Sequence, residues 1–333
     1  MFTPGWRLGL LLGLIGLNGA LRGQEQDLRQ RFVTGQRVEE QGDFEQARKI
    51  FSDVVERSDR NGDEATRVMA LDNLAATYAD MARYDDAERI WKRTLAATER
   101  LAGPKSASMA RVLWNLGSMY RETGRQEDAD SFIRRFEEIA PLDLTSDPIL
   151  ASENLSYLGL IYIGRRMPEK AIPLFSQSLE IMEKQPNFSR AQAARILIES
   201  AAACSDAQRF GDAMSNLNKA GAFLDTLEQP PLRLKLELLA TRGRINAHAK
   251  HIAEADECYS EAERIAEQTY GPDHPFVAMV LRSHAAMLRQ AGDKKHAAAL
   301  EKRADLIFTI SRRTNSRSNS IDVSTLGLRA SGK

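Results

Sequence analysis

An alanine recurs along most of this chain at a nearly fixed interval. Seven alanines follow one another with spacings of 40, 42, 42, 42, 42 and 42 residues: Ala47, Ala87, Ala129, Ala171, Ala213, Ala255 and Ala297. A period of this length is the signature of an array in which each unit packs on its neighbours. Length alone, 333 residues, suggests about two globular domains. The repeat makes one continuous array the better interpretation.

Two further sets of equivalent positions, which we call columns, recur at fixed distances from the alanines. Twelve residues before each alanine the side chain is always tiny: Gly35, Ala75, Gly117, Gly159, Ala201, Gly243 and Ala285. Four residues after each alanine stand mostly large apolar side chains: Phe51, Trp91, Ile133, Phe175, Leu217, Tyr259 and Glu301. A tiny residue that faces an alanine lets two helices approach closely. The large side chains are expected to fill the seam between successive helical hairpins, so the pattern predicts an all-α fold.

The motifs resemble those of a known repeat. Leu116-Gly117 is followed by Tyr120, Leu158-Gly159 is followed by Tyr162, and residues 270–278 read Tyr-Gly-Pro-Asp-His-Pro-Phe-Val-Ala. In these features the chain resembles the tetratricopeptide repeat family, and the 42-residue period resembles the kinesin light chain subtype. The resemblance implies a right-handed α-solenoid of about seven helix-turn-helix repeats. Ser200, Arg242 and His284 depart from it, since leucine is expected at those positions.

The two ends of the chain differ from its middle. Arg7 precedes the apolar stretch Leu8–Leu17, so residues 1–23 are expected to form a cleaved signal peptide, with an uncleaved N-terminal anchor as the alternative. Either form predicts export, to the periplasm or outside the cell. Residues 311–333 are rich in Ser, Arg and Asn and are expected to be a disordered tail. The array is placed at residues 24–310, with repeats at about 28–60, 68–102, 110–144, 152–186, 194–228, 236–270 and 278–310.

Composition and motifs argue against nucleic-acid binding, catalysis and metal binding. Lys plus Arg and Asp plus Glu are both 46, so the formal charge is zero, which argues against nucleic acid as a partner. The sequence holds no Gly-rich phosphate loop and no His-Glu-x-x-His motif. We therefore expect no enzyme, no cofactor and no metal, although His248 and His251 are spaced as a conceivable metal pair. Cys204 is interpreted as a small core residue, with a disulfide to Cys258 as the less favoured alternative.

The resemblance also implies where a partner would bind. In proteins with this repeat, the first helix of each hairpin lines a concave groove that binds peptides. The matching positions here are Asp72, Asn73, Arg111, Trp114, Asn115, Arg121, Tyr157, Arg195, Glu199, Arg244 and Arg282. Trp114 and Tyr157 are the expected anchors, because large amphipathic rings dominate interface energies.

The sequence thus predicts a non-enzymatic scaffold that binds a peptide or protein segment, with no integral membrane domain once the signal is removed. The alternative is a self-assembly module of the cell envelope that joins copies end to end. Arg31 and Glu301 stand where the other repeats have apolar residues, which argues mildly against self-association. Asp273 is expected to cap the helix that begins near Pro275.

Overall fold

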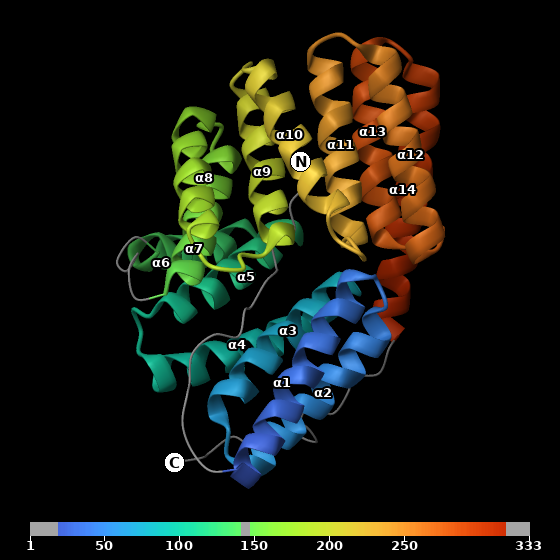
Figure 1. The fold of residues 1–333 in the computed structure, drawn as a ribbon. Helices are drawn as coiled ribbons and strands as arrows, with labels where there is room; N and C mark the ends of the chain where they lie inside the picture. Colours follow the sequence, from blue (N-terminus) through green and yellow to red (C-terminus); the bar gives the residue numbers. More distant parts are fainter. Residues whose placement is uncertain (1–18, 141–146, 318–333) are drawn as a thin grey trace. The chain divides into compact units, whose positions relative to one another are not determined.

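The structure is a computed structural model that describes residues 19–140 and 147–317, and within these ranges the regular elements are all α-helices (Figure 1). Consecutive helices pair as seven hairpins. The helices are α1 (Gly19–Glu40), α2 (Phe44–Asn61), α3 (Glu64–Asp80), α4 (Tyr84–Ala102), α5 (Ala107–Glu122), α6 (Gln126–Ile139), α7 (Pro148–Gly164), α8 (Pro168–Glu183), α9 (Arg190–Asp206), α10 (Phe210–Asp225), α11 (Leu232–His248), α12 (Ile252–Tyr270), α13 (Pro275–Ala291) and α14 (Lys294–Arg317). The predicted all-α repeat fold is confirmed.

The described residues fall into two compact units, one with α1–α6 and one with α7–α14. Within each unit the second helix of a hairpin packs on the first helix of the next, as α2 does on α3 and α8 on α9. First helices also contact the next first helix, most extensively α9 with α11. Each unit is therefore a stack of hairpins in chain order, in which every hairpin buries its apolar side chains against its neighbours.

The turn inside each hairpin repeats one backbone conformation. The residue five positions before each repeat alanine has a positive φ: Gly42, Ala82, Gly124, Arg166, Gln208, Lys250 and Gly292. Only three of the seven are glycine, the residue that tolerates this conformation without strain. The next residue donates its backbone N–H to a carbonyl of the preceding helix, as Arg83 does to Tyr78 over 2.8 Å. Satisfying that carbonyl offsets the strain at the four other turns.

The repeat alanines and glycines play different parts in the close packing. All seven alanines are fully buried. A Cβ added to Gly117 would lie 2.9 Å from Ile133, against 3.5 Å from the carbonyl oxygen of Ala129. At Gly35, Gly159 and Gly243 the nearest atoms belong to the rings of Phe51, Phe175 and Tyr259. The glycine thus makes room chiefly for the large side chain one turn beyond the alanine, and that side chain packs within its own hairpin. The ring of Tyr259 also reaches the expected seam between hairpins, where it stacks on His284 of the next hairpin.

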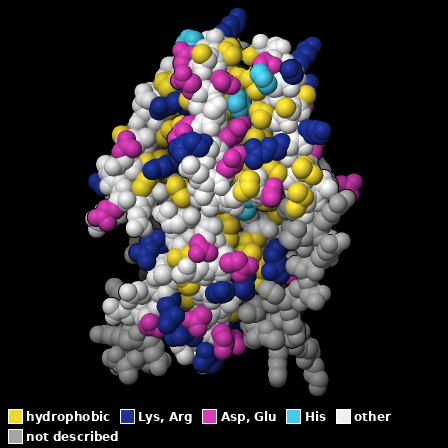
Figure 2. All heavy atoms as spheres, turned by 90° about the vertical axis from the view of Figure 1, so that its right-hand side faces the viewer, with side chains coloured by type: hydrophobic (Ala, Val, Ile, Leu, Met, Phe, Trp, Pro, Cys, Tyr) yellow, Lys and Arg dark blue, Asp and Glu magenta, His cyan; other side chains and the backbone are white. Residues whose placement is uncertain are grey.

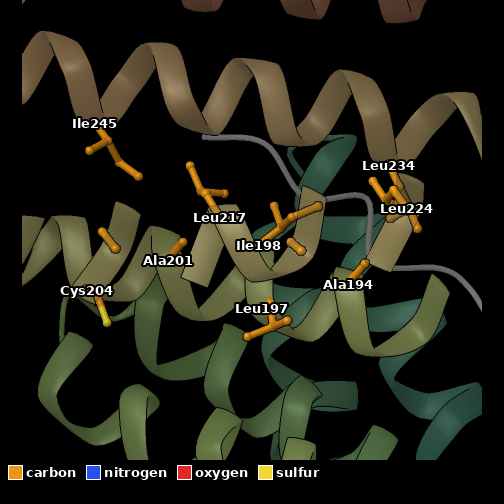
Figure 3. Close-up of a cluster of buried hydrophobic side chains, with 11 residues drawn as sticks. Ala194, Leu197, Ile198, Ala201, Cys204, Leu217, Leu224, Leu234 and Ile245 are labelled. Atoms are coloured by element: carbon orange, nitrogen blue, oxygen red, sulfur yellow. The ribbon is translucent and has the colours of Figure 1, made fainter. Parts of the chain in front are cut away.

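The core between hairpins is built from aliphatic side chains. In the second unit, Leu197 of α9, Leu217 and Leu224 of α10, and Leu234 and Ile245 of α11 converge with their neighbours in one buried cluster (Figure 3). Cys204 is buried in the same cluster, as predicted for a small core residue. Both Cys204 and Cys258 are free thiols.

The ends of the array differ from the predicted boundaries. Helix α1 already begins at Gly19, inside the predicted signal segment, and α14 continues to Arg317, seven residues past the predicted end of the array. In the other six hairpins the first helix begins three or four residues before the predicted repeat. The rest of the predicted signal peptide and tail, 1–18 and 318–333, lies outside the described residues, so both assignments stay predictions. In the part of the chain that is described, no helix is both long and apolar enough to cross a membrane.

The cap of α13 is His274 instead of Asp273. The imidazole Nδ1 of His274 accepts a hydrogen bond from the backbone N–H of Phe276 over 3.1 Å, and Pro275 occupies the first turn. The ring of His274 stacks on Tyr270 with 5.1 Å between centroids. Accepting this bond requires a neutral ring, and burial lowers the pKa of His274 to about 4. Gly271 before it has the same extended, positive-φ conformation as Gly103, which precedes α5.

We predict that Gly159→Ala destabilises the protein by about 1–3 kcal/mol, because the added methyl carbon would lie 2.6 Å from the ring of Phe175. Gly221→Ala is the matched control, since its Cβ would lie 3.8 Å from Leu238, an ordinary contact, and alanine favours a helix. Urea unfolding followed by circular dichroism measures both. Equal stability of Gly159→Ala and wild type would contradict the packing described above.

We also predict an acid-sensitive contribution from His274. Its pKa is depressed in the fold, so its stabilisation is complete above about 6.5, the unfolded value, and is lost as pH falls toward 4. Relative to His274→Ser, which caps the helix without titrating in this range, wild type should lose up to ~3 kcal/mol between pH 6.5 and 4. Unfolding curves of both proteins across this range give the difference. A constant difference would show that the ring does not cap the helix in its neutral form.

Candidate functional site

The predicted groove residues lie on first helices, but most of them are buried. Arg121 and Arg244 are partly exposed and Arg282 is exposed. The remaining members are at most 7% exposed: Asp72, Asn73, Arg111, Trp114, Asn115, Tyr157, Arg195 and Glu199. Because first helices contact one another within each unit, side chains on this face pack between helices. Two separate groups result, one in each unit.

Trp114 and Tyr157 are not exposed anchors. Both rings have no exposed surface, so the prediction that they present themselves to a partner is wrong for this structure. Trp114 packs against Phe136 of α6 at 5.9 Å, and the guanidinium of Arg121 lies over its ring at 5.7 Å. The anchor role was predicted from ring size, yet a large ring that packs against neighbouring helices gains more from burial than from exposure.

In the first unit, Asp72 of α3 is the centre of a buried polar group. Its Oδ1 accepts hydrogen bonds from the Trp91 indole N–H at 2.9 Å and from the Asn115 amide at 3.0 Å. Its Oδ2 is 3.0 Å from Nε of Arg111. Asp72 thereby links α3 with α4 and α5. Asn73 donates to the carbonyl of Met69 in its own helix. These polar side chains hold the second and third hairpins together, and their role in peptide binding stays a prediction.

In the second unit, Arg195 and Glu199 form a buried ion pair one turn apart on α9. The Nη1 of Arg195 lies 2.9 Å from Oε1 of Glu199, and the hydroxyl of Ser156 on α7 donates to the other carboxylate oxygen. Burial raises the pKa of Glu199 in spite of the adjacent guanidinium. Burial is the largest effect on Arg195 and works against its charge, but Glu199, Tyr157, Glu153 and Glu237 together outweigh burial and raise the pKa of Arg195.

The same face of α9 carries buried polar atoms without a partner among the described residues. Nε and Nη2 of Arg195 are two such donors, and Oε1 of Gln192 is such an acceptor. Gln192 precedes Arg195 by one turn, and its amide N–H donates to Glu153 of α7 at 3.3 Å. Buried polar groups are rarely left unpaired, because each costs about 1–3 kcal/mol. Sequence reasoning missed Gln192 and Ser156, which carry no motif signal of their own.

Toward α11 the face becomes partly exposed. His248 Nδ1 lies 3.0 Å from the hydroxyl of Ser205, and Arg244 lies 3.8 Å from Asp206. Burial lowers the pKa of His248, helped by the positive charge of Arg244. The described residues include no group of three or more His, Cys, Asp or Glu side chains able to hold a metal.

Arg282 does not join this face. Its guanidinium pairs with Asp305 of α14 at 2.7 Å and lies over the ring of Phe308 at 4.6 Å. The face of the molecule drawn in Figure 2 mixes positive and negative side chains, with hydrophobic ones between them. Such mixing of charge agrees with the formal charge of zero.

We predict that Glu199→Ala destabilises the protein by about 3–5 kcal/mol, because it leaves the guanidinium of Arg195 buried without its counter-ion. Replacing both residues by leucine should recover most of this loss. The exposed pair Arg209 and Asp212 on the same hairpin is the control, and its removal should cost under about 1 kcal/mol. Chemical unfolding of the single, double and control variants measures these differences. A single variant no worse than the double one would mean that the pair is not buried.

Comparisons with known proteins agree with this architecture. The family model described as tetratricopeptide repeat matches residues 65–141 and 236–304. Protein KINESIN LIGHT CHAIN-RELATED 3 of Arabidopsis thaliana is 24% identical over 254 residues, which are 74% of this chain and 38% of the relative. Protein KINESIN LIGHT CHAIN-RELATED 1 of the same plant is 25% identical over 153 residues, 44% of this chain and 24% of the relative. The chain thus matches well under half the length of each.

Among solved structures, a crystal structure of a Rap protein complexed with competence and sporulation factor has a TM-score of 0.64. It covers 90% of this chain and 78% of its own at 14% sequence identity, which shows a shared fold. The recurring small residues, the stacked hairpins and these matches together show tetratricopeptide repeats in this chain that are similar to those of kinesin light chain-related proteins.

Proposed function

We propose that the face formed by α7, α9 and α11 binds an extended peptide segment of a protein partner. A fold of this repeat type serves in general as a non-enzymatic scaffold for protein interactions. The observation that carries the proposal is the set of unpaired polar atoms on α9, the two donors of Arg195 and the acceptor of Gln192. A helical stack gains nothing in stability from leaving these atoms unpaired, so we infer that they are kept for a ligand.

The chemistry of these atoms fits a peptide group. A guanidinium donates to a carbonyl oxygen, and a side-chain amide oxygen accepts from a backbone N–H. Both groups stand one turn apart on a single helix. Three carboxylates act on Arg195, those of Glu199, Glu153 and Glu237. This negative surrounding disfavours an acidic segment, so we expect one that is neutral or basic at this point.

Access to Arg195 requires a side-chain movement. The residue is 7% exposed, and its guanidinium lies over the ring of Tyr157 at 5.9 Å. An arginine side chain has several rotatable bonds, so it can swing toward solvent without displacing the helix. Tyr157, which we expected to be an anchor for the partner, would then lose its contact with the guanidinium of Arg195 when the arginine moves. Self-assembly end to end, the other function that the sequence suggested, and export both rest on the sequence alone.

The test is selection from a random peptide library on the purified protein, followed by calorimetry with the best peptide. We predict that the double variant Arg195→Leu/Glu199→Leu weakens its affinity at least ~10-fold, because two charge-assisted donors are lost. Arg209→Ala/Asp212→Ala, an exposed ion pair on the same hairpin, should bind as wild type does.

Circular dichroism of both variants establishes that each is folded before binding is measured. Equal affinity of the leucine variant and wild type for the peptide would show that the α7–α9–α11 face is not the binding site. Failure to select any peptide would count against a linear segment as the ligand.

A further inference from the structure

A histidine on the first helix of the last hairpin lies between two carboxylates of the preceding helix. Nδ1 of His284 on α13 is 2.6 Å from Oε1 of Glu263, and Nε2 is 2.8 Å from Oδ1 of Asp256. Both acids belong to α12, one turn on either side of Tyr259. The ring of His284 stacks on that tyrosine with 5.3 Å between centroids and 15° between planes. The imidazole is only 5% exposed.

The position of His284 in the repeat makes this contact unusual. Thirteen residues before the repeat alanine, the second, third and fourth hairpins carry leucine: Leu74, Leu116 and Leu158. The position of Glu263, eight residues after the alanine, is aliphatic in three earlier second helices: Val55, Leu95 and Leu179. The equivalent pairs Val55 with Leu74 and Leu95 with Leu116 are therefore apolar, whereas Glu263 with His284 is charged. Because Ser200 and Arg242 replace leucine in the two preceding repeats, leucine at this position is not required in every hairpin.

The geometry requires a particular protonation state. A carboxylate can only accept a hydrogen bond, and a neutral imidazole has one donor and one lone pair. Both contacts of His284 are hydrogen bonds only when the ring is a cation with two N–H donors. When the proton leaves, one ring nitrogen turns a lone pair toward a carboxylate oxygen, and one attraction becomes a repulsion.

We propose that Asp256, His284 and Glu263 form a pH-sensitive clamp that holds the last hairpin, α13–α14, against α12 and loosens it as pH rises. The clamp closes the contact between the sixth and seventh hairpins, beside the buried cluster of Tyr259, Ala285 and Leu288. Because it lies on the packing side of α13, its opening changes how firmly the final hairpin is attached. It does not depend on the peptide-binding proposal.

The charges around the ring favour this behaviour. From α12 it meets Asp256 and Glu263, together with the ring of Tyr259. On α11, the positive charge of Arg242 interacts with Cys258 and that of Arg244 interacts with Tyr259.

On α14, Glu301 and Asp305 are paired with Arg289 and Arg282 of α13. Burial lowers the pKa of His284, but the two carboxylates outweigh burial and leave the pKa above its ordinary value. Its stabilisation is thus complete below about 6.5 and is lost as pH rises through the higher pKa of the folded protein.

Two measurements on the full chain test the clamp. Carbon-13 NMR of the histidine rings, assigned with His284→Leu, gives the titration midpoint of His284. Hydrogen exchange read by mass spectrometry, corrected for intrinsic rates, gives the protection of residues 275–317 from pH 6 to 9. We expect a midpoint above 6.5, and a loss of protection of about tenfold for each pH unit by which the midpoint exceeds that value.

Glu263→Gln should lower the midpoint of His284 and shrink the loss of protection by the same factor. His284→Leu should abolish the loss. The control is His296→Gln, which removes an exposed histidine whose ring contacts Asp293 of the same hairpin and should change nothing. A midpoint of His284 at or below about 6.5, or the same pH dependence in wild type and His284→Leu, would overturn the clamp. If His284→Leu does not fold, the comparison of Glu263→Gln with wild type decides the question alone.

Discussion

Each hairpin depends on one close contact between its two helices. At four repeats a large side chain of the second helix occupies the space that a missing Cβ leaves on the first, as Phe175 does at Gly159. The repeat alanine lies one turn earlier on the second helix and is always fully buried. The glycine position and the large side chain opposite it set the distance between the two helices of a hairpin. That distance determines the shape of the surface that packs on the next hairpin. Without it the recurring leucines would have no common surface to fill.

The stacking of the hairpins also determines which polar side chains meet in the interior. Because first helices of a unit contact one another, charged residues in neighbouring repeats meet inside the protein. Asp72 receives bonds from two neighbouring helices, α4 and α5, and Glu199 receives one from α7. Buried charges of this kind seldom add stability over apolar packing, but they are intolerant of mispairing.

The candidate face and the His284 clamp follow from the same arrangement in different ways. On α9 the stack leaves donors of Arg195 unsatisfied, and the proposed binding role of that face rests on this observation. On α13 the stack satisfies His284 on both sides, which makes one interface depend on a proton. The two features differ in how they relate to the repeat. Arg195 stands at a position that is also charged in neighbouring repeats, as Arg111 and Glu153 show, whereas His284 replaces a leucine of earlier repeats.

The sequence by itself determined the helical hairpins, their number and their register, because a 42-residue period of small and large side chains allows few other folds. It also marked Cys204 as a core residue and His284 as a departure from the repeat. Exposure was decided only in the tertiary structure. Trp114 and Tyr157 share a helix face with predicted groove residues, yet whether that face meets solvent or a neighbouring helix depends on how closely hairpins stack. The partners of His284 were hidden for the same reason, since Asp256 and Glu263 lie on another hairpin. A repeat period specifies which residues are equivalent, and only the stacking distance specifies what each of them touches.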